Sequence, residues 1–145
     1  MDFKNFIFEN EKNMKDTRST LSNIPKKHSA LIKGYKFIFQ PDNTLKKYKN
    51  HVGIIDDDKK TITIAAPYNY GREFVLLHEL GHIVWKKFVS SDLQKKWHKI
   101  AKPYLEKLND TSEEIFCMIY ANNHCKNKIS KFEIPELNQF VNKIT

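Results

Sequence analysis

The spacing of apolar residues changes at Pro67, and this change constrains the fold more than any other feature of the sequence. Before it, aromatic or β-branched residues gather in three short runs, residues 35–40, 52–55 and 61–66, which predict strands. After it, apolar residues recur at helical spacing from about residue 72 to 89. Further helices are expected at residues 21–33, from Ser90 or Ser91 to about Leu105, and at residues 110–126 and 135–144. Pro103 is expected to kink or divide the second of these. Strands followed by helices predict an α+β fold with a short mixed or antiparallel sheet.

The length and composition fit one folded domain. The chain has 145 residues, of which 40% are hydrophobic and 12% aromatic, enough to bury one core. Residues 1–20 are polar and lack a clear period, so we expect an N-terminal arm that is loosely ordered or a short helix, and a single domain over residues 21–145. No apolar run approaches the roughly 20 residues that a membrane span needs. The two cysteines, Cys117 and Cys125, are too few for a fold that is held together by disulfides, and we expect them to be buried thiols.

The positive charge of the chain comes almost entirely from lysine. There are 25 Lys and Arg residues against 17 Asp and Glu, a formal net charge of +8, but Arg18 and Arg72 are the only arginines. Arginine is the residue that holds phosphates and guanine edges with two hydrogen bonds, so nucleic acid is not an expected partner. The first ten residues do not resemble a secretory signal, which predicts a cytoplasmic location. We expect a monomer.

The most informative stretch is His78-Glu79-Leu80-Gly81-His82, inside the helix expected after Pro67. Residues four apart on a helix project from one face, so both imidazoles can reach one zinc ion at about 2.0–2.1 Å. Glu79 lies about 100° round the helix from His78, where it can accept a proton from water beside the metal. Gly81 costs about 1 kcal/mol in a helix interior, which predicts that another backbone comes close to it. One Zn²⁺ per chain is the expected cofactor.

A catalytic zinc ion needs a third protein ligand and one open position. Glu113 and Glu114 begin an apolar helix, and an acid on its buried side would need a partner such as a metal. The alternative is that both acids only complement the positive end of the helix dipole. The residues alone leave these choices open, with further candidates at His98, Glu106, Asp110, His124 and Cys125.

Three stretches resemble the zincin metallopeptidases of the gluzincin type, in particular the anthrax-lethal-factor-type and Pro-Pro-endopeptidase domains. They are Thr61-Ile-Thr-Ile64 with Phe74-Val-Leu-Leu-His-Glu-Leu-Gly-His82, then Glu113-Glu-Ile-Phe-Cys-Met-Ile-Tyr120, then the tail with Pro135 and Phe140. Together they span about residues 35–145. The resemblance implies a small zincin fold and a zinc metalloendopeptidase that hydrolyses a protein or peptide substrate with Glu79 as general base.

The same resemblance assigns further residues. It implies that Glu114 is the third zinc ligand and that Glu113 is an acid beside the ligands. It also implies that residues 61–66 are an edge strand on which an extended peptide lies, with contacts from Thr61, Ile62, Thr63 and Ile64. The family supplies a tyrosine that steadies the oxyanion; Lys107 occupies the matching position, and Tyr104 is the nearest substitute. Otherwise Tyr104 is an ordinary aromatic residue of the preceding helix.

Other interpretations compete with this one. Residues 72–82 also resemble the cytoplasmic ImmA/IrrE metalloproteases, which cleave repressors, although the Leu-Met-Pro segment typical of them is missing. A different class of function is a catalytically weak zincin-fold module that binds or regulates a partner protein. The lethal-factor-type relatives offer secretion as the alternative to a cytoplasmic location.

Overall fold

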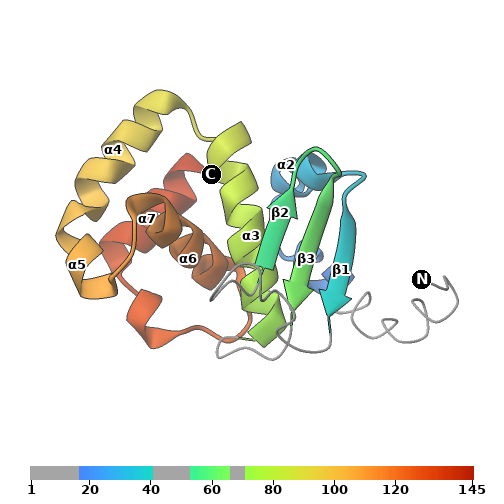
Figure 1. Ribbon diagram of the computed structural model, residues 1–145. Helices are drawn as coiled ribbons and strands as arrows, with labels where there is room; N and C mark the ends of the chain where they lie inside the picture. Colours follow the sequence, from blue (N-terminus) through green and yellow to red (C-terminus); the bar gives the residue numbers. More distant parts are fainter. Residues whose placement is uncertain (1–16, 41–52, 66–70) are drawn as a thin grey trace, which may run out of the picture.

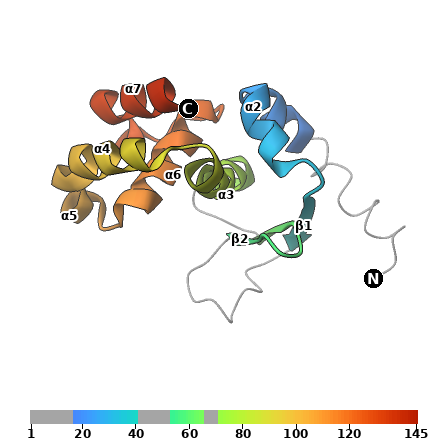
Figure 2. The ribbon, with the colours of Figure 1, turned by 90° about the horizontal axis from the view of Figure 1, so that it is seen from above.

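The computed structural model describes residues 17–40, 53–65 and 71–145. Helix α3 (Gly71–Lys87) lies at the centre, with a small sheet on one side and the later helices on the other (Figure 1). Figure 2 shows the same layers from above, with α3 between the strands and the group formed by α4, α6 and α7. Both faces of α3 are therefore covered, which explains why Leu77, Leu80 and Val84 are fully buried.

The sheet has three strands in the order β1-β3-β2. Strand β1 (Lys36–Gln40) pairs in parallel with β3 (Thr61–Ala65), and β2 (Gly53–Asp56) pairs with β3 in antiparallel fashion. The α+β class and the small mixed sheet are thus confirmed.

The prediction that residues 61–66 form an edge strand is wrong. Strand β3 is central, so its main-chain groups pair with strands on both sides and Thr61, Ile62, Thr63 and Ile64 cannot receive a peptide. The alternation of β-branched residues correctly indicates that Ile62 and Ile64 are buried. It does not indicate whether a strand pairs with β3 on one side or on both. In the described part of the sheet, β1 and β2 are the outer strands.

Most helices begin and end near the predicted residues. The later ones are α4 (Ser91–Ala101), α5 (Leu105–Leu108), α6 (Ser112–His124) and α7 (Pro135–Ile144). Ser90 caps α4 by accepting a hydrogen bond from the Leu93 amide. Pro103 lies in the short 3₁₀ helix η2 (Lys102–Tyr104), which separates α4 from α5 as expected.

The N-terminal region differs from the single helix predicted over residues 21–33. Residues 17–22 are helical, the chain then turns, and α2 (Lys26–Ser29) follows Pro25, with a 3₁₀ helix (Ala30–Ile32) after it. Pro25 has φ −57° and ψ 140°, so it stands before α2 instead of in its first turn. Of the arm predicted over residues 1–20, only residues 17–20 are described.

Helices α3 and α6 cross closely at Gly81. A Cβ atom added to Gly81 would lie 3.0 Å from the Cα atom of Cys117 and 3.2 Å from its Cβ atom. The predicted close approach of another backbone is therefore confirmed. Gly81 brings the first turn of α6 up to the face of α3 that carries the two histidines.

A polar cluster fastens the sheet to the end of α3. Asp57, in the turn after β2, accepts hydrogen bonds from the Tyr35 hydroxyl at 2.8 Å and from the Lys86 ammonium at 3.0 Å. The Lys87 ammonium donates to the Tyr35 hydroxyl at 2.9 Å. The hydrogen bonds from Tyr35 and Lys86 hold the pKa of the Asp57 carboxyl below its usual value. This cluster fixes the position of β2 relative to α3.

Another buried cluster joins the two ends of the described chain. His28 is fully buried, and its Nε2 donates to the main-chain oxygen of Thr145 at 2.8 Å while its Nδ1 accepts from the Tyr120 hydroxyl at 3.0 Å. Burial lowers the pKa of His28. Among the helices that the structure describes, none has the length and apolar character needed to span a membrane.

Candidate metal centre

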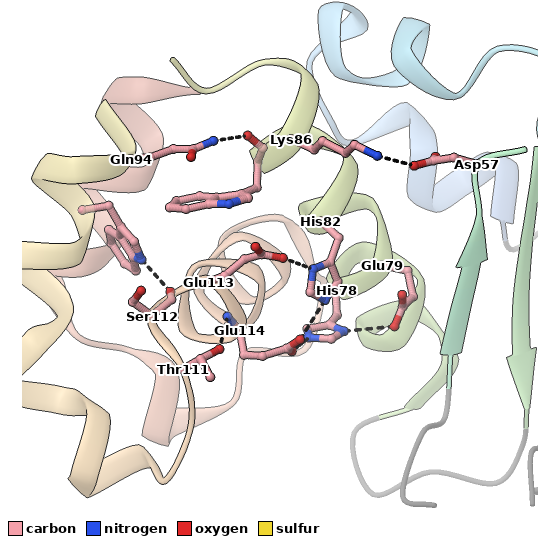
Figure 3. Close-up of polar contacts among 12 residues, drawn as sticks. Asp57, His78, Glu79, His82, Lys86, Gln94, Thr111, Ser112, Glu113 and Glu114 are labelled. Carbon is pink, nitrogen blue, oxygen red and sulfur yellow. Dashed lines mark hydrogen bonds and ion pairs between the residues drawn. The ribbon is translucent and has the colours of Figure 1, made fainter. Parts of the chain in front are cut away.

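Two helices supply the candidate site. Helix α3 presents His78 and His82 from one face, with ring centroids 5.0 Å apart and planes at 84°. The first turn of α6 presents Glu113 and Glu114 toward them (Figure 3). Thr111 caps this turn by accepting a hydrogen bond from the Glu114 amide at 3.3 Å. The local sequence therefore places two imidazoles and two carboxylates opposite each other.

All four imidazole nitrogens of His78 and His82 contact a carboxylate oxygen. Both Nε2 atoms face Glu114, at 2.8 Å from its Oε2 for His78 and 3.1 Å from its Oε1 for His82. The Nδ1 atoms are held from the other side, His78 by Glu79 at 3.2 Å and His82 by Glu113 at 2.8 Å. A metal-bound histidine usually donates its second ring N–H to a carboxylate or carbonyl in this way.

The charge of this group fits a divalent cation. Three carboxylates surround the two imidazoles. If both rings are neutral and donate from Nδ1, each has an Nε2 lone pair that faces the Glu114 carboxylate. A lone pair facing a carboxylate at these distances requires a positive charge between them, either a proton on each ring or a metal ion. Ligand atoms around a tetrahedral zinc lie about 3.3 Å apart, a short adjustment from the observed contacts.

Without a metal, protons supply that charge. Burial lowers the pKa of His78, but hydrogen bonds to Glu114 and Glu79 outweigh it and raise the pKa from 6.5 to about 9. Burial likewise lowers the pKa of His82, and the contact with Glu114 outweighs it so that the net change is upward. Burial raises the pKa of the Glu114 carboxyl, but its bonds to both imidazoles hold it well below the usual range.

The raised pKa of His78 predicts a pH dependence of stability in the metal-free protein. A histidine whose folded pKa is about 9, against 6.5 when unfolded, stabilises the fold below pH 6.5 and loses that contribution as the pH rises through 9. The loss is at most about 3 kcal/mol. The free energy of unfolding in urea, measured between these pH values, should show this loss in the metal-free protein. It should not show the loss in zinc-loaded protein, where the ion would replace the proton. If the free energy of unfolding changed equally with pH in the metal-free and zinc-loaded forms, the pH dependence could not be assigned to His78.

Glu79 occupies a pocket that only glycine permits. Its side chain is 8% exposed and packs against Gly53, the first residue of β2. A Cβ atom added to Gly53 would lie 2.7 Å from Glu79 Cγ and 2.8 Å from Oε1, closer than real side-chain contacts. A glycine inside a strand can indicate close approach of another group, and Gly53 is such a case that was not predicted.

Replacing Gly53 with alanine should therefore displace Glu79. If Glu79 acts as a general base, the displaced carboxylate would lower kcat by up to about 100-fold, because small misplacements of a reacting group have effects of this size. Zinc affinity should also fall, by up to about 10-fold, because the displaced carboxylate no longer supports the Nδ1 atom of His78. Gly34→Ala is the matched control, since Gly34 has φ +86° and open space around it, so this variant lowers stability only. Wild-type kcat in Gly53→Ala would show that Glu79 does not need this position.

Cys117 is a further potential ligand that the structure brings to the site. One ligand atom each from His78, His82 and Cys117 lie within 4.8 Å of one another. Cys117 is fully buried, however, and burial together with the nearby carboxylates, Glu114 first among them, raises the pKa of its thiol. Cys117 and Glu114 are thus the two candidates for a third ligand beside the histidines, and Glu114 is the one whose carboxylate oxygens both Nε2 atoms contact.

The remaining candidates lie elsewhere. Tyr104 packs from η2 against the hydrophobic core, and among the described residues it makes no contact with the histidines or acids of the site. Its alternative role as an ordinary aromatic residue fits this packing. His98 contacts Ser112, His124 packs on Tyr120, and Cys125 is a buried free thiol at the end of α6.

The comparisons with known proteins leave the assignment to the geometry. No protein-family model, no curated protein and no solved structure matches the chain. Any function must therefore be argued from the side chains of α3 and α6 and from the strand beside them.

Proposed function

We propose that this protein is a zinc-dependent metalloendopeptidase with a zincin-like arrangement of its sheet and site helices. His78, His82 and Glu114 would hold the ion, with Glu113 orienting His82 through its Nδ1 atom. The observation that carries the proposal is that every imidazole nitrogen of this pair contacts a carboxylate, with both Nε2 atoms directed at Glu114. Such a cluster needs either protons on both rings or a bound cation, and its histidine and carboxylate donors suit zinc.

When bound, a zinc ion with three protein ligands supplies a Lewis acid and a nucleophilic water at neutral pH. Glu79 then has the role of general base: its carboxylate takes a proton from the attacking water and returns it to the leaving amine. Burial beside Gly53 keeps this carboxylate next to the two ligands of α3 and away from bulk solvent. Glu113 and Glu79 hold the Nδ1 atoms of the two imidazoles and keep both Nε2 atoms directed at Glu114, where they would bind the ion.

The substrate we propose is an extended peptide or protein segment that pairs with β2. This strand is at the edge of the described sheet and begins at Gly53, directly beside Glu79. Main-chain hydrogen bonds to such an edge bind a peptide without requiring a particular sequence. In this proposal β2 is the edge strand that binds the peptide, the role first expected of residues 61–66. Strand β3 pairs with β2 on its inner side.

Cleavage of a diverse peptide library tests the proposal. The purified full chain, loaded with one zinc ion, should cleave a subset of peptides at internal bonds, and chelation should stop cleavage until zinc is restored. Mass spectrometry of the products then gives the cleavage positions. No cleavage by protein that holds stoichiometric zinc would refute the peptidase.

A second candidate is a zinc-holding module that binds a partner without cleaving it. The contact between Glu79 Oε1 and His78 Nδ1, at 3.2 Å, favours it, because Glu79 could serve only to orient the ring. The two candidates differ in what the loss of the Glu79 charge does to activity and to zinc affinity.

A further inference from the structure

Helix α4 is attached to α6 at the residue before the two acids. Trp97 of α4 is fully buried, and its indole N–H donates to the main-chain oxygen of Ser112 at 2.6 Å. The next residue of α4, His98, contacts the Ser112 hydroxyl through Nδ1. Ser112 is the first residue of α6, so its hydroxyl and its carbonyl are both held from α4.

The same point is supported from α3. The ring of Trp85, one turn beyond His82, lies 5.5 Å from the His98 ring and 5.0 Å from the Phe116 ring of α6. The Trp97 ring meets Phe116 edge-on at 5.7 Å. Helices α3, α4 and α6 therefore meet beside the turn that carries the acids.

The attachment of α4 to Ser112 stabilises the first turn of α6. The first turn of a helix is the part most prone to fraying, because its amides lack partners within the helix. Here that turn carries both Glu113 and Glu114, whose side chains are 45% and 33% exposed and receive little support from packing. The cap of Thr111 holds one amide, while Trp97 holds the turn against the core.

We infer that Trp97 and Ser112 are positioning residues for the metal site, which fix the first turn of α6 so that Glu113 and Glu114 meet the two histidines of α3. The inference rests on the proposed function, since it assumes that this cluster holds zinc. Trp97 touches neither the ion nor the substrate. It acts through the backbone of Ser112, and its loss should be measured as weaker zinc binding.

The test compares Trp97→Phe with Tyr120→Phe in the full chain, using competition with a chromophoric chelator to measure the zinc dissociation constant. Each variant removes one buried hydrogen bond and keeps an aromatic ring; Tyr120 lies on the same helix but bonds to His28. Both should lower the urea midpoint of the metal-free protein. Trp97→Phe should weaken zinc binding about 10-fold, the lower end of the effect of outer partners, and Tyr120→Phe less than twofold.

Ser112→Ala provides a second variant with little risk to folding, because it removes only the hydroxyl that faces His98. It should weaken zinc binding in the same direction by a smaller factor. If wild-type protein binds zinc and neither Trp97→Phe nor Ser112→Ala differs from Tyr120→Phe, this inference is wrong and the proposed function stands. If wild-type protein binds no zinc, both are wrong.

Discussion

Replacing Glu79 with glutamine is expected to reduce peptidase activity by about 10²–10⁴-fold while zinc stays bound. Glutamine has the shape of glutamate, so it fits the pocket beside Gly53, and its amide oxygen can still accept a hydrogen bond from His78 Nδ1. It cannot take a proton from water. The ligands should therefore remain in place while proton transfer is lost.

The measurement is kcat/KM on a cleaved library peptide, together with zinc per chain and the zinc dissociation constant. Glu106→Gln is the matched control, because Glu106 is an exposed acid on α5 and its loss removes the same charge away from the site. Unchanged activity in Glu79→Gln would end the proposed mechanism. A loss of zinc in proportion to the loss of activity would instead assign Glu79 to orienting His78, as the second candidate requires.

Replacing Glu114 with glutamine should weaken zinc binding by more than the roughly 100-fold upper range for outer partners. Both Nε2 atoms contact the Glu114 carboxylate, and an amide cannot supply its negative charge to the ion. The neighbouring variant Glu113→Gln changes only the support of His82 Nδ1, at 2.8 Å, and its amide oxygen can still accept that hydrogen bond, so it should weaken zinc binding by at most about 10-fold.

Comparing these two adjacent variants separates a ligand from a supporting acid. Each removes one charge from the same turn of α6, so general electrostatic effects on the site are nearly matched. Zinc dissociation constants at one pH and salt concentration give the comparison. Equal effects of the two variants, or a larger effect of Cys117→Ala, would contradict the assignment of Glu114 as third ligand.

The parts of the site that were predictable are those fixed by local spacing. Residues four apart on a helix share a face whatever surrounds them, so the pairing of His78 with His82 follows from the sequence. The start of the acidic helix is equally local, and α6 begins at Ser112, within two residues of the predicted start. The cost of Gly81 in a helix correctly indicated the backbone of Cys117 nearby.

The parts that were not predictable depend on contacts between distant segments. Strand β3 is central because β1, more than 20 residues earlier in the chain, pairs with it in parallel. The alternation of residues within β3 does not indicate this pairing. The pocket of Gly53 and the bond from Trp97 to Ser112 likewise join separate elements. A single sequence gives the residue types for such contacts but not their partners.

Zinc K-edge X-ray absorption on the zinc-loaded full chain tests the central claim most directly, because it reports the atoms bound to the ion. Histidine and carboxylate ligands should give nitrogen and oxygen neighbours at about 2.0–2.2 Å, with imidazole scattering from His78 and His82. A sulfur neighbour at about 2.3 Å would place Cys117 in the site and contradict the ligand set proposed here. So would a spectrum without imidazole, since the account requires both histidines of α3.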